Sequence, residues 1–172
     1  MCIRDRYNVD ANCSTSKWLG ERPVTGITPL YWAASGGHIE LVELLIGIID
    51  DVNVSCTDDS YTALHVACSR GHSELVKWLL ARQADVNARE QTGATPLYVA
   101  AQYGRADIVK LLLDNEADVN ASRTVDGSTP LYVAARNEHV DIVKLLLDNE
   151  ADVNASRTDN GATPLYLSLI HI

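Results

Sequence analysis

The chain has 172 residues, of which 47% are apolar and 22% charged, a composition typical of a folded protein rather than a disordered one. Its 14 Lys and Arg residues against 23 Asp and Glu residues give a formal net charge of −9. Because phosphate backbones and anionic lipids are bound by basic patches, this balance argues against a nucleic-acid partner.

Membrane insertion and export are not expected either. No apolar run approaches the roughly 20 residues of a membrane-spanning helix, and no apolar segment of the secretory type follows the first residues. The four cysteines are few and irregularly spaced for a disulfide framework. We therefore expect an intracellular protein, cytoplasmic or nuclear, while secretion into a host as an effector stays an open alternative.

The six residues at each end of the chain are related through DNA rather than through protein structure. One codon choice for Met1–Arg6 is ATG TGT ATA AGA GAC AG, and its reverse complement in a shifted frame encodes Leu167–Ile172. This inverted pair resembles a transposase-end adaptor used to prepare sequencing libraries. We therefore expect residues 1–6 and 167–172 to be adaptor translation and exclude them from reasoning about the fold.

A motif of Thr, then Pro or Ala, then Leu, then Tyr or His recurs along the chain. Its leucines are spaced by 34, 33, 34 and 34 residues, at Leu30, Leu64, Leu97, Leu131 and Leu165. A Val-Asn pair recurs in phase, ending at Asn53, Asn87, Asn120 and Asn154. Periods of this length are typical of repeat proteins, in which each unit buries its core against its neighbours.

The unit at residues 93–126 shows the local chemistry. Thr95 is placed to cap a helix with its hydroxyl, and Pro96 suits the first helical position. Apolar residues at i, i+3 and i+4 from Leu97 form one helical stripe. A second, more apolar helix is predicted over residues 108–113. Each unit is therefore expected to be a pair of helices.

This pattern resembles the ankyrin repeat family, whose units read approximately G-x-T-P-L-x-x-A-A-x-x-G-H, then V-x-x-L-L, then A-x-V-N. The resemblance implies an all-α ankyrin-repeat solenoid of helix–turn–helix units with β-turn fingers, four full repeats and partial ends. The array is expected over residues 26–166, after residues 7–25 as a partial preceding repeat with an insertion. The expected repeats are 26–59, 60–92, 93–126, 127–160 and a partial unit at 161–166.

Several positions depart from the family pattern. The glycine that usually ends the second helix is replaced by Ile49, Gln83, Glu116 and Glu150, and Glu138 replaces the glycine after the first helix of its repeat. A left-handed backbone there would disfavour these side chains by about 1 kcal/mol each. Trp32 and Trp78 are expected in the core, whereas Trp18 is either an exposed anchor or a plug that folds back.

The resemblance implies that a partner protein binds to the finger tips and to the first helices on the concave side. Carried over by position, the expected contact residues are Asp58, Asp59, Tyr61, Arg70, Gln91, Thr92, Gln102, Tyr103, Asp126, Ser128, Arg136 and Asn137. Tyr and Arg often dominate interface energy, and the Asp-rich tips favour a partner with a basic surface. We predict a non-catalytic interaction scaffold that needs no cofactor or small-molecule substrate.

Two alternatives remain for the role of such an array. It would serve equally as the targeting arm of a larger truncated enzyme, of kinase or ubiquitin-ligase type, or as a structural tether between membrane and cytoskeleton. The identical segments 107–124 and 141–158 are produced by recent duplication or by misassembly of a repetitive gene.

Two further kinds of site arise from the sequence. His65, Cys68 and His72 have spacings that would suit zinc, but the repeat pattern already accounts for these residues, so we expect no metal. The family also includes substrates of an asparaginyl hydroxylase that favours Leu, a spacer and Asp-Val-Asn. This resemblance implies possible hydroxylation at Asn53, Asn87, Asn120 and Asn154.

Overall fold

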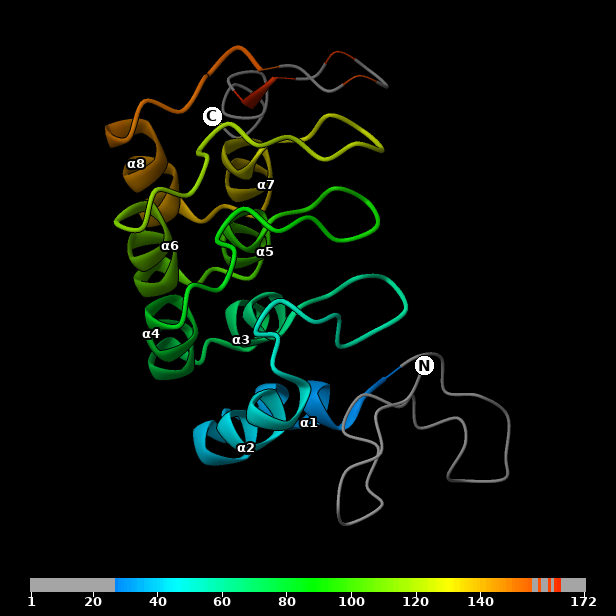
Figure 1. Cartoon of the computed structure of the whole chain (residues 1–172). Coiled ribbons are helices and arrows are strands. Elements are labelled where there is room, and N and C mark those ends of the chain that lie inside the picture. The colour runs from blue at the N-terminus through cyan, green and yellow to red at the C-terminus, as the bar shows by residue number, and fades with distance from the viewer. Residues whose placement is uncertain (1–26, 156–157, 159–160, 162, 165–172) are drawn as a thin grey trace. The chain divides into compact units, whose positions relative to one another are not determined.

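The computed structural model describes residues 27–155, together with residues 158, 161, 163 and 164 (Figure 1). The predicted adaptor segments and residues 7–25 lie outside the described residues, as does most of the predicted partial unit 161–166. The chain divides into two compact units, Met1–Asp85 and Val86–Ile172, and each is described by itself.

Both units consist of antiparallel helix pairs. The first holds α1 (Pro29–Ser35), α2 (Ile39–Ile49), α3 (Ala63–Arg70) and α4 (Ser73–Ala81). The second holds α5 (Pro96–Gln102), α6 (Ala106–Leu113), α7 (Pro130–Arg136) and α8 (Val140–Asp148). Within the described residues the extended structure is limited to one isolated bridge, between Ser55 and Thr62. The expected all-α class is confirmed.

Threonine side chains start the first helix of every pair. Each threonine adopts an extended backbone, and its hydroxyl accepts a hydrogen bond from the amide three residues later; these residues are Thr28, Thr62, Thr95 and Thr129. This bond satisfies an amide that has no partner inside the helix. Three of the helices continue with proline, whose fixed φ suits the first turn. The capping predicted from the sequence therefore fixes the residue at which the first helix of each repeat begins.

The second helices end in left-handed backbone, as the departures from the family pattern predict. Gln83, Glu116 and Glu150 have φ of 62°, 64° and 64°, and Glu138 has φ of 59° after its first helix. In the first repeat the expectation for Ile49 is wrong. There α2 continues through Ile49 and the left-handed residue is Asp50, whose amide donates to the Ile46 carbonyl at 2.7 Å.

Leucine, isoleucine, valine and alanine from both helices of each pair form the core. Its largest fully buried side chains include Leu30, Leu64, Leu75, Leu79, Leu97, Ile108, Leu112, Ile142 and Leu146. These are the apolar stripes that the repeat pattern predicts. Burial of such stripes is the main favourable contribution to the stability of both units.

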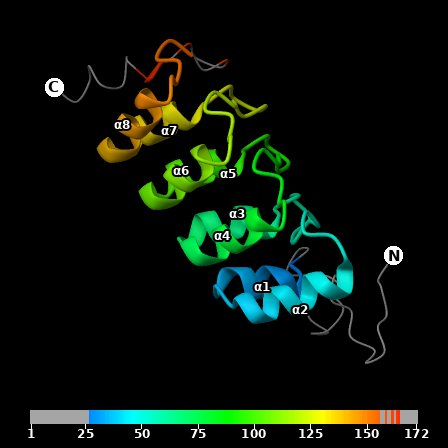
Figure 2. The same cartoon turned by 60° about the vertical axis from the view of Figure 1, so that its left-hand side comes forward.

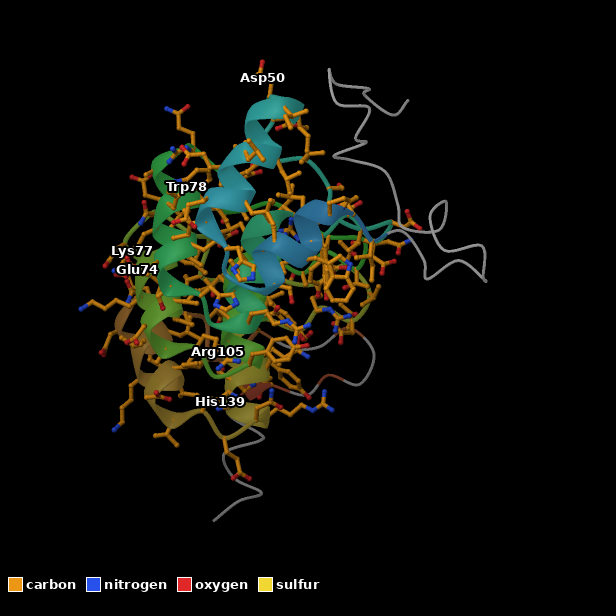
Figure 3. The ribbon with its side chains drawn as sticks, turned by 90° about the horizontal axis from the view of Figure 1, so that it is seen from below. Asp50, Glu74, Lys77, Trp78, Arg105 and His139 are labelled. Atoms are coloured by element: carbon orange, nitrogen blue, oxygen red, sulfur yellow. The ribbon has the colours of Figure 1, made fainter. Side chains whose placement is uncertain are left out.

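The prediction that Trp32 and Trp78 lie in the core is wrong. Trp32 is 59% exposed, because the described residues contain no helix pair that precedes α1 and α2 (Figure 2). Trp78 is half-buried on α4, next to Lys77 (Figure 3). The guanidinium of Arg82 lies over its ring at 3.6 Å from the centroid and also donates to Glu43 Oε1 at 2.6 Å. Trp78 thus takes part in a surface cation–π contact rather than in the core.

Side chains also join consecutive repeats within each unit. In the first unit, Asn53 Oδ1 accepts from the Asp85 amide at 2.8 Å. In the second unit, Asn87 and Asn120 accept in the same way from the amides of Asp118 and Asp152, both at 2.8 Å. The asparagine of the Val-Asn marker is therefore a structural acceptor that fixes the distance between one repeat and the next.

Candidate protein-binding surfaces

In the first unit, the finger of the second repeat presents its carboxylates to solvent. Asp58 and Asp59 are exposed at its tip, and Tyr61 is half-buried with its ring 5.3 Å from that of His65. The Tyr61 amide donates to Thr57 Oγ1 at 3.2 Å, which closes the loop. Arg70 is exposed at the end of α3. Three of these four predicted residues are thus open to a partner, and Tyr61 is partly open.

In the second unit, a buried carboxylate organises the finger at residues 90–94. Glu90 is buried, and its carboxylate accepts hydrogen bonds from the amides of Thr92 and Ala94 at 3.0 and 2.9 Å. The Thr92 hydroxyl donates to the same carboxylate. Because a carboxylate holds the turn from inside, Gln91 is left exposed at the tip.

Arg123 connects this finger to the next one. Its Nε and Nη2 donate to Thr92 Oγ1 at 3.2 and 3.1 Å, and Nη1 lies 3.5 Å from Asp126 Oδ2. The guanidinium also donates to the Tyr98 hydroxyl at 3.5 Å and lies over the Tyr98 ring. One side chain therefore joins two fingers and α5.

The backbones of the two fingers are also in direct contact. The Thr124 amide and hydroxyl both donate to the Thr92 carbonyl at 2.9 Å. A Cβ placed on Gly93 would lie 2.6 Å from the Thr124 nitrogen, so only glycine allows this approach. Val125, at the tip of the second finger, is 59% exposed. The finger pair is thus held at its base while both tips face solvent.

Ser128 and Asp126 of the predicted contact set take part in hydrogen bonds within the finger. Ser128 is only 2% exposed, since its hydroxyl donates to Asp126 Oδ1 at 2.6 Å and lies 3.2 Å from the Tyr98 hydroxyl. Asp126 is half-buried and also accepts from the Ser128 amide. Ser128 therefore stabilises the finger from inside and exposes little surface, and Thr92 is half-buried in the same network.

The predicted helix-end residues of the second unit are exposed. Tyr103 is 52% exposed after α5, and Gln102, Arg136 and Asn137 are exposed as well. The Asn137 side chain donates to the Gln102 carbonyl at 2.9 Å, so the ends of α5 and α7 are joined. Tyrosine and arginine are both residue types that often dominate the binding energy of a protein interface.

The electrostatics of the finger pair centre on Glu90. Burial acts to raise its pKa, but the hydrogen bonds from Thr92 and from the Ala94 amide outweigh burial, and the charge of Arg123 adds to them. The pKa of Glu90 is therefore lowered from its ordinary value. The ionised form is the one that holds the finger.

We expect Glu90→Gln to weaken the dependence of stability on acid pH. A carboxylate whose folded-state pKa is lowered contributes stability above its unfolded pKa of about 4.3 and loses it as pH falls through the folded value. The measurement is urea unfolding at several pH values below neutrality. The slope below about pH 4.3 should be shallower in the variant. Equal acid slopes in the variant and the parent chain would contradict this role for Glu90.

The residues whose spacing would suit zinc take part in the packing and hydrogen bonds of the first unit. His65 is fully buried, with Nδ1 2.9 Å from the Thr62 hydroxyl, and His72 Nε2 lies 2.8 Å from the Ser35 carbonyl. Burial raises the pKa of the Cys68 thiol, and it raises that of Cys56 to about 12. Both thiols are buried in the packing of the first unit. Among the described residues, no three His, Cys, Asp or Glu side chains form a metal-binding group.

Sequence reasoning missed Glu90, Tyr98 and Arg123, which organise the finger pair. Glu90 and Arg123 stand at loop positions that normally face solvent, and a single sequence gives no signal that a loop carboxylate is buried. Tyr98 carries a usable signal, because it stands where the family has histidine. Its hydroxyl reaches the next finger, which a histidine ring at that position would not do.

Comparison with known proteins agrees with the repeat architecture. The sequence model for ankyrin repeats in three copies matches residues 3–90, 30–123, 82–157 and 121–171, so it covers nearly the whole chain. This chain belongs to the ankyrin repeat family, and the resemblance drawn from its motifs is confirmed. No curated protein matched the sequence. In the part of the chain that the structure describes, every helix is too short or too polar to cross a membrane.

Proposed function

We propose that this chain is a non-catalytic scaffold that binds a partner protein through its finger tips and the ends of its first helices. Members of the ankyrin repeat family generally serve as protein-interaction modules. The observation that carries the proposal is the finger pair of the second unit. Arg123 and Glu90 order its base, while Gln91 and Val125 remain exposed at the tips. An ordered surface loses little conformational entropy on binding.

The proposed anchors are Tyr103 and Arg136 in the second unit and Arg70 in the first. Each is exposed at the end of a first helix. Asp58 and Asp59, at an acidic tip, favour a partner with a basic surface and would speed its association. Binding of such a partner should weaken as the salt concentration rises.

The test is affinity capture from cells of the source organism with three forms of the chain. The anchor variant is Tyr103→Ala with Arg136→Ala, and the matched control is Lys110→Ala with Lys144→Ala, at exposed positions on α6 and α8. Truncating an anchor costs about 2 kcal/mol, or roughly 30-fold in affinity. Partners kept by the control and lost by the anchor variant support the proposal. Partners that all three forms retain equally would overturn it.

We also propose hydroxylation at Asn53, Asn87, Asn120 and Asn154, all of which are exposed. Three of these side chains hold the next repeat through Oδ1, which leaves their exposed faces open to an enzyme. Incubation with an asparaginyl hydroxylase should add one oxygen to a peptide containing one of these residues, as measured by mass spectrometry. Unmodified peptides for all four sites would exclude the modification.

A further inference from the structure

The two fingers of the second unit, at residues 90–94 and 122–128, project from the same side of α5 and α7 (Figure 1). Their carboxylates are turned away from solvent. Glu90 is 7% exposed, and the side chain of Asp126 is 17% exposed. The guanidinium of Arg123 lies 3.5 Å from the Asp126 carboxylate and balances its charge. The negative charge of this finger pair is therefore mostly internal, in contrast to the acidic tip of the first unit.

Arg89 carries an exposed positive charge at the base of the same finger pair. Its Nη1 donates to the Gly93 carbonyl at 3.2 Å and to the Ser122 carbonyl at 2.9 Å, so the side chain joins both fingers. Neither bond uses Nε or Nη2. Among the described residues, Arg89 forms no ion pair with a carboxylate. Arg89 is thus an ordered cation with donors left for a ligand.

An exposed apolar side chain lies close to this cation. Val125 is 59% exposed at the tip of the second finger. It follows Ser122, whose carbonyl binds Arg89, by three positions in the sequence. Three residues of extended chain span at most about 10 Å. Such a surface suits a peptide that carries a carboxylate near an apolar side chain.

The repeat pattern does not account for Arg89. The residues at the same position of the other repeats are serines, at Ser55, Ser122 and Ser156. Ser55 and Ser122 are exposed, as Arg89 is. The exposed cation is therefore a property of this one repeat and adds a charge that the general repeat pattern does not supply.

We propose that the finger pair binds an acidic segment of the partner protein, with a carboxylate on Arg89 and an apolar side chain on Val125. This inference rests on the proposed scaffold function and names the chemistry of the partner at one surface. The planar guanidinium offers parallel donors that match a carboxylate. Because two carbonyls already order the Arg89 side chain, little rotamer entropy is lost on binding.

A short acidic segment fits this surface better than a nucleic acid does. The formal net charge of −9 repels a long polyanion. Exposed charges more than about 10 Å apart are largely screened at 0.1 M salt, so a short segment responds mainly to the nearby cation. A phosphate backbone also brings no apolar side chain to Val125.

The test is selection of peptides from a phage-displayed random library on the full chain, followed by affinity measurements with the selected peptides. Arg89→Gln removes the charge and keeps an amide donor for the two carbonyls, whereas Arg89→Lys keeps the charge. The matched control is Lys110→Gln, which removes an exposed cation from α6 of the same unit. Hydrogen exchange at the Thr124 amide reports whether the finger pair stays intact. Val125→Ser tests the apolar contact without touching the Arg89 hydrogen bonds.

The selected peptides should be rich in Asp and Glu, and their affinity should fall as the salt concentration rises. Arg89→Gln should bind them roughly tenfold more weakly, since a charge-assisted pair is lost. Arg89→Lys should bind more tightly than Arg89→Gln, and Lys110→Gln should match the parent chain. Val125→Ser should weaken binding severalfold with unchanged exchange at Thr124.

Selection of neutral or basic peptides would overturn this inference, as would acidic peptides that bind the parent chain and Arg89→Gln equally. Either result leaves the scaffold function standing, because the Tyr103 and Arg136 variants test that function separately. Displacement of the selected peptides by a short DNA duplex at equal charge concentration would also overturn the inference, since it would show a surface for any polyanion.

Discussion

Replacing Gln83, Glu116 and Glu150 together with glycine should raise the free energy of unfolding by about 2 kcal/mol, since each is a non-glycine residue in left-handed backbone. Their φ values lie between 62° and 64°. All three side chains are exposed, so the substitutions remove no core packing. Glycine also increases the entropy of the unfolded chain, which makes the expected gain per site smaller than the full left-handed strain. Urea unfolding of the parent and triple variant measures the difference.

The control is the same chemical change in helical backbone. Glu43→Gly, within α2, should lower the free energy of unfolding by about 1 kcal/mol, because glycine is a poor helix former. The Glu43 ion pair with Arg82 is exposed on both sides and adds little to this loss. A triple glycine variant that is less stable than the parent chain would contradict the claim that the backbone is strained at these three positions.

Gly93→Ala should destabilise the second unit by about 2 kcal/mol and loosen the finger pair, because an added Cβ meets backbone and φ is strained at the same position. The Cβ would lie 2.6 Å from the Thr124 nitrogen, and Gly93 has φ of 83°. The Thr124 amide would have to move away from the Thr92 carbonyl that it contacts. Hydrogen exchange should therefore speed up at Thr124 as stability falls.

Gly47→Ala is the matched control for that substitution. Gly47 lies in α2 with no heavy atom within 4 Å of an added Cβ, so alanine should stabilise the helix by about 1 kcal/mol. The same substitution thus has opposite signs at two positions. A Gly93→Ala chain with parent-like stability and parent-like exchange at Thr124 would contradict the role given to glycine in the finger contact.

The helix pairs could be predicted from the sequence because every repeat carries its own helix-capping threonine. Thr95 and Pro96 define one helix end by local chemistry alone, and Thr28 and Thr129 do the same in other repeats. The left-handed positions were also predictable, because the family pattern has glycine where Gln83 and Glu116 stand. Asp50 was misjudged because one extra residue extends α2, and a change of phase that small is not visible in the repeat spacing.

The candidate surface was less predictable than the fold. Exposure of Tyr103 and Arg136 followed from their repeat position, whereas Ser128 is buried by contacts that depend on neighbouring fingers. The error at Trp32 has a different origin. Trp32 is exposed although Val66, Val99 and Val133 at the equivalent positions are buried, and an apolar residue type alone does not separate these cases.

The asparagine hydrogen bonds make the two ends of a repeat chemically different. Asn53, Asn87 and Asn120 offer an acceptor at the end of one repeat, and an aspartate amide of the following repeat supplies the donor. Because every junction of this kind has the same chemistry, a repeat gained or lost as a whole leaves each acceptor facing a donor. Arrays built this way change length without redesign of their junctions. The identity of residues 107–124 and 141–158 is compatible with that rule, since identical repeats satisfy the same contacts twice.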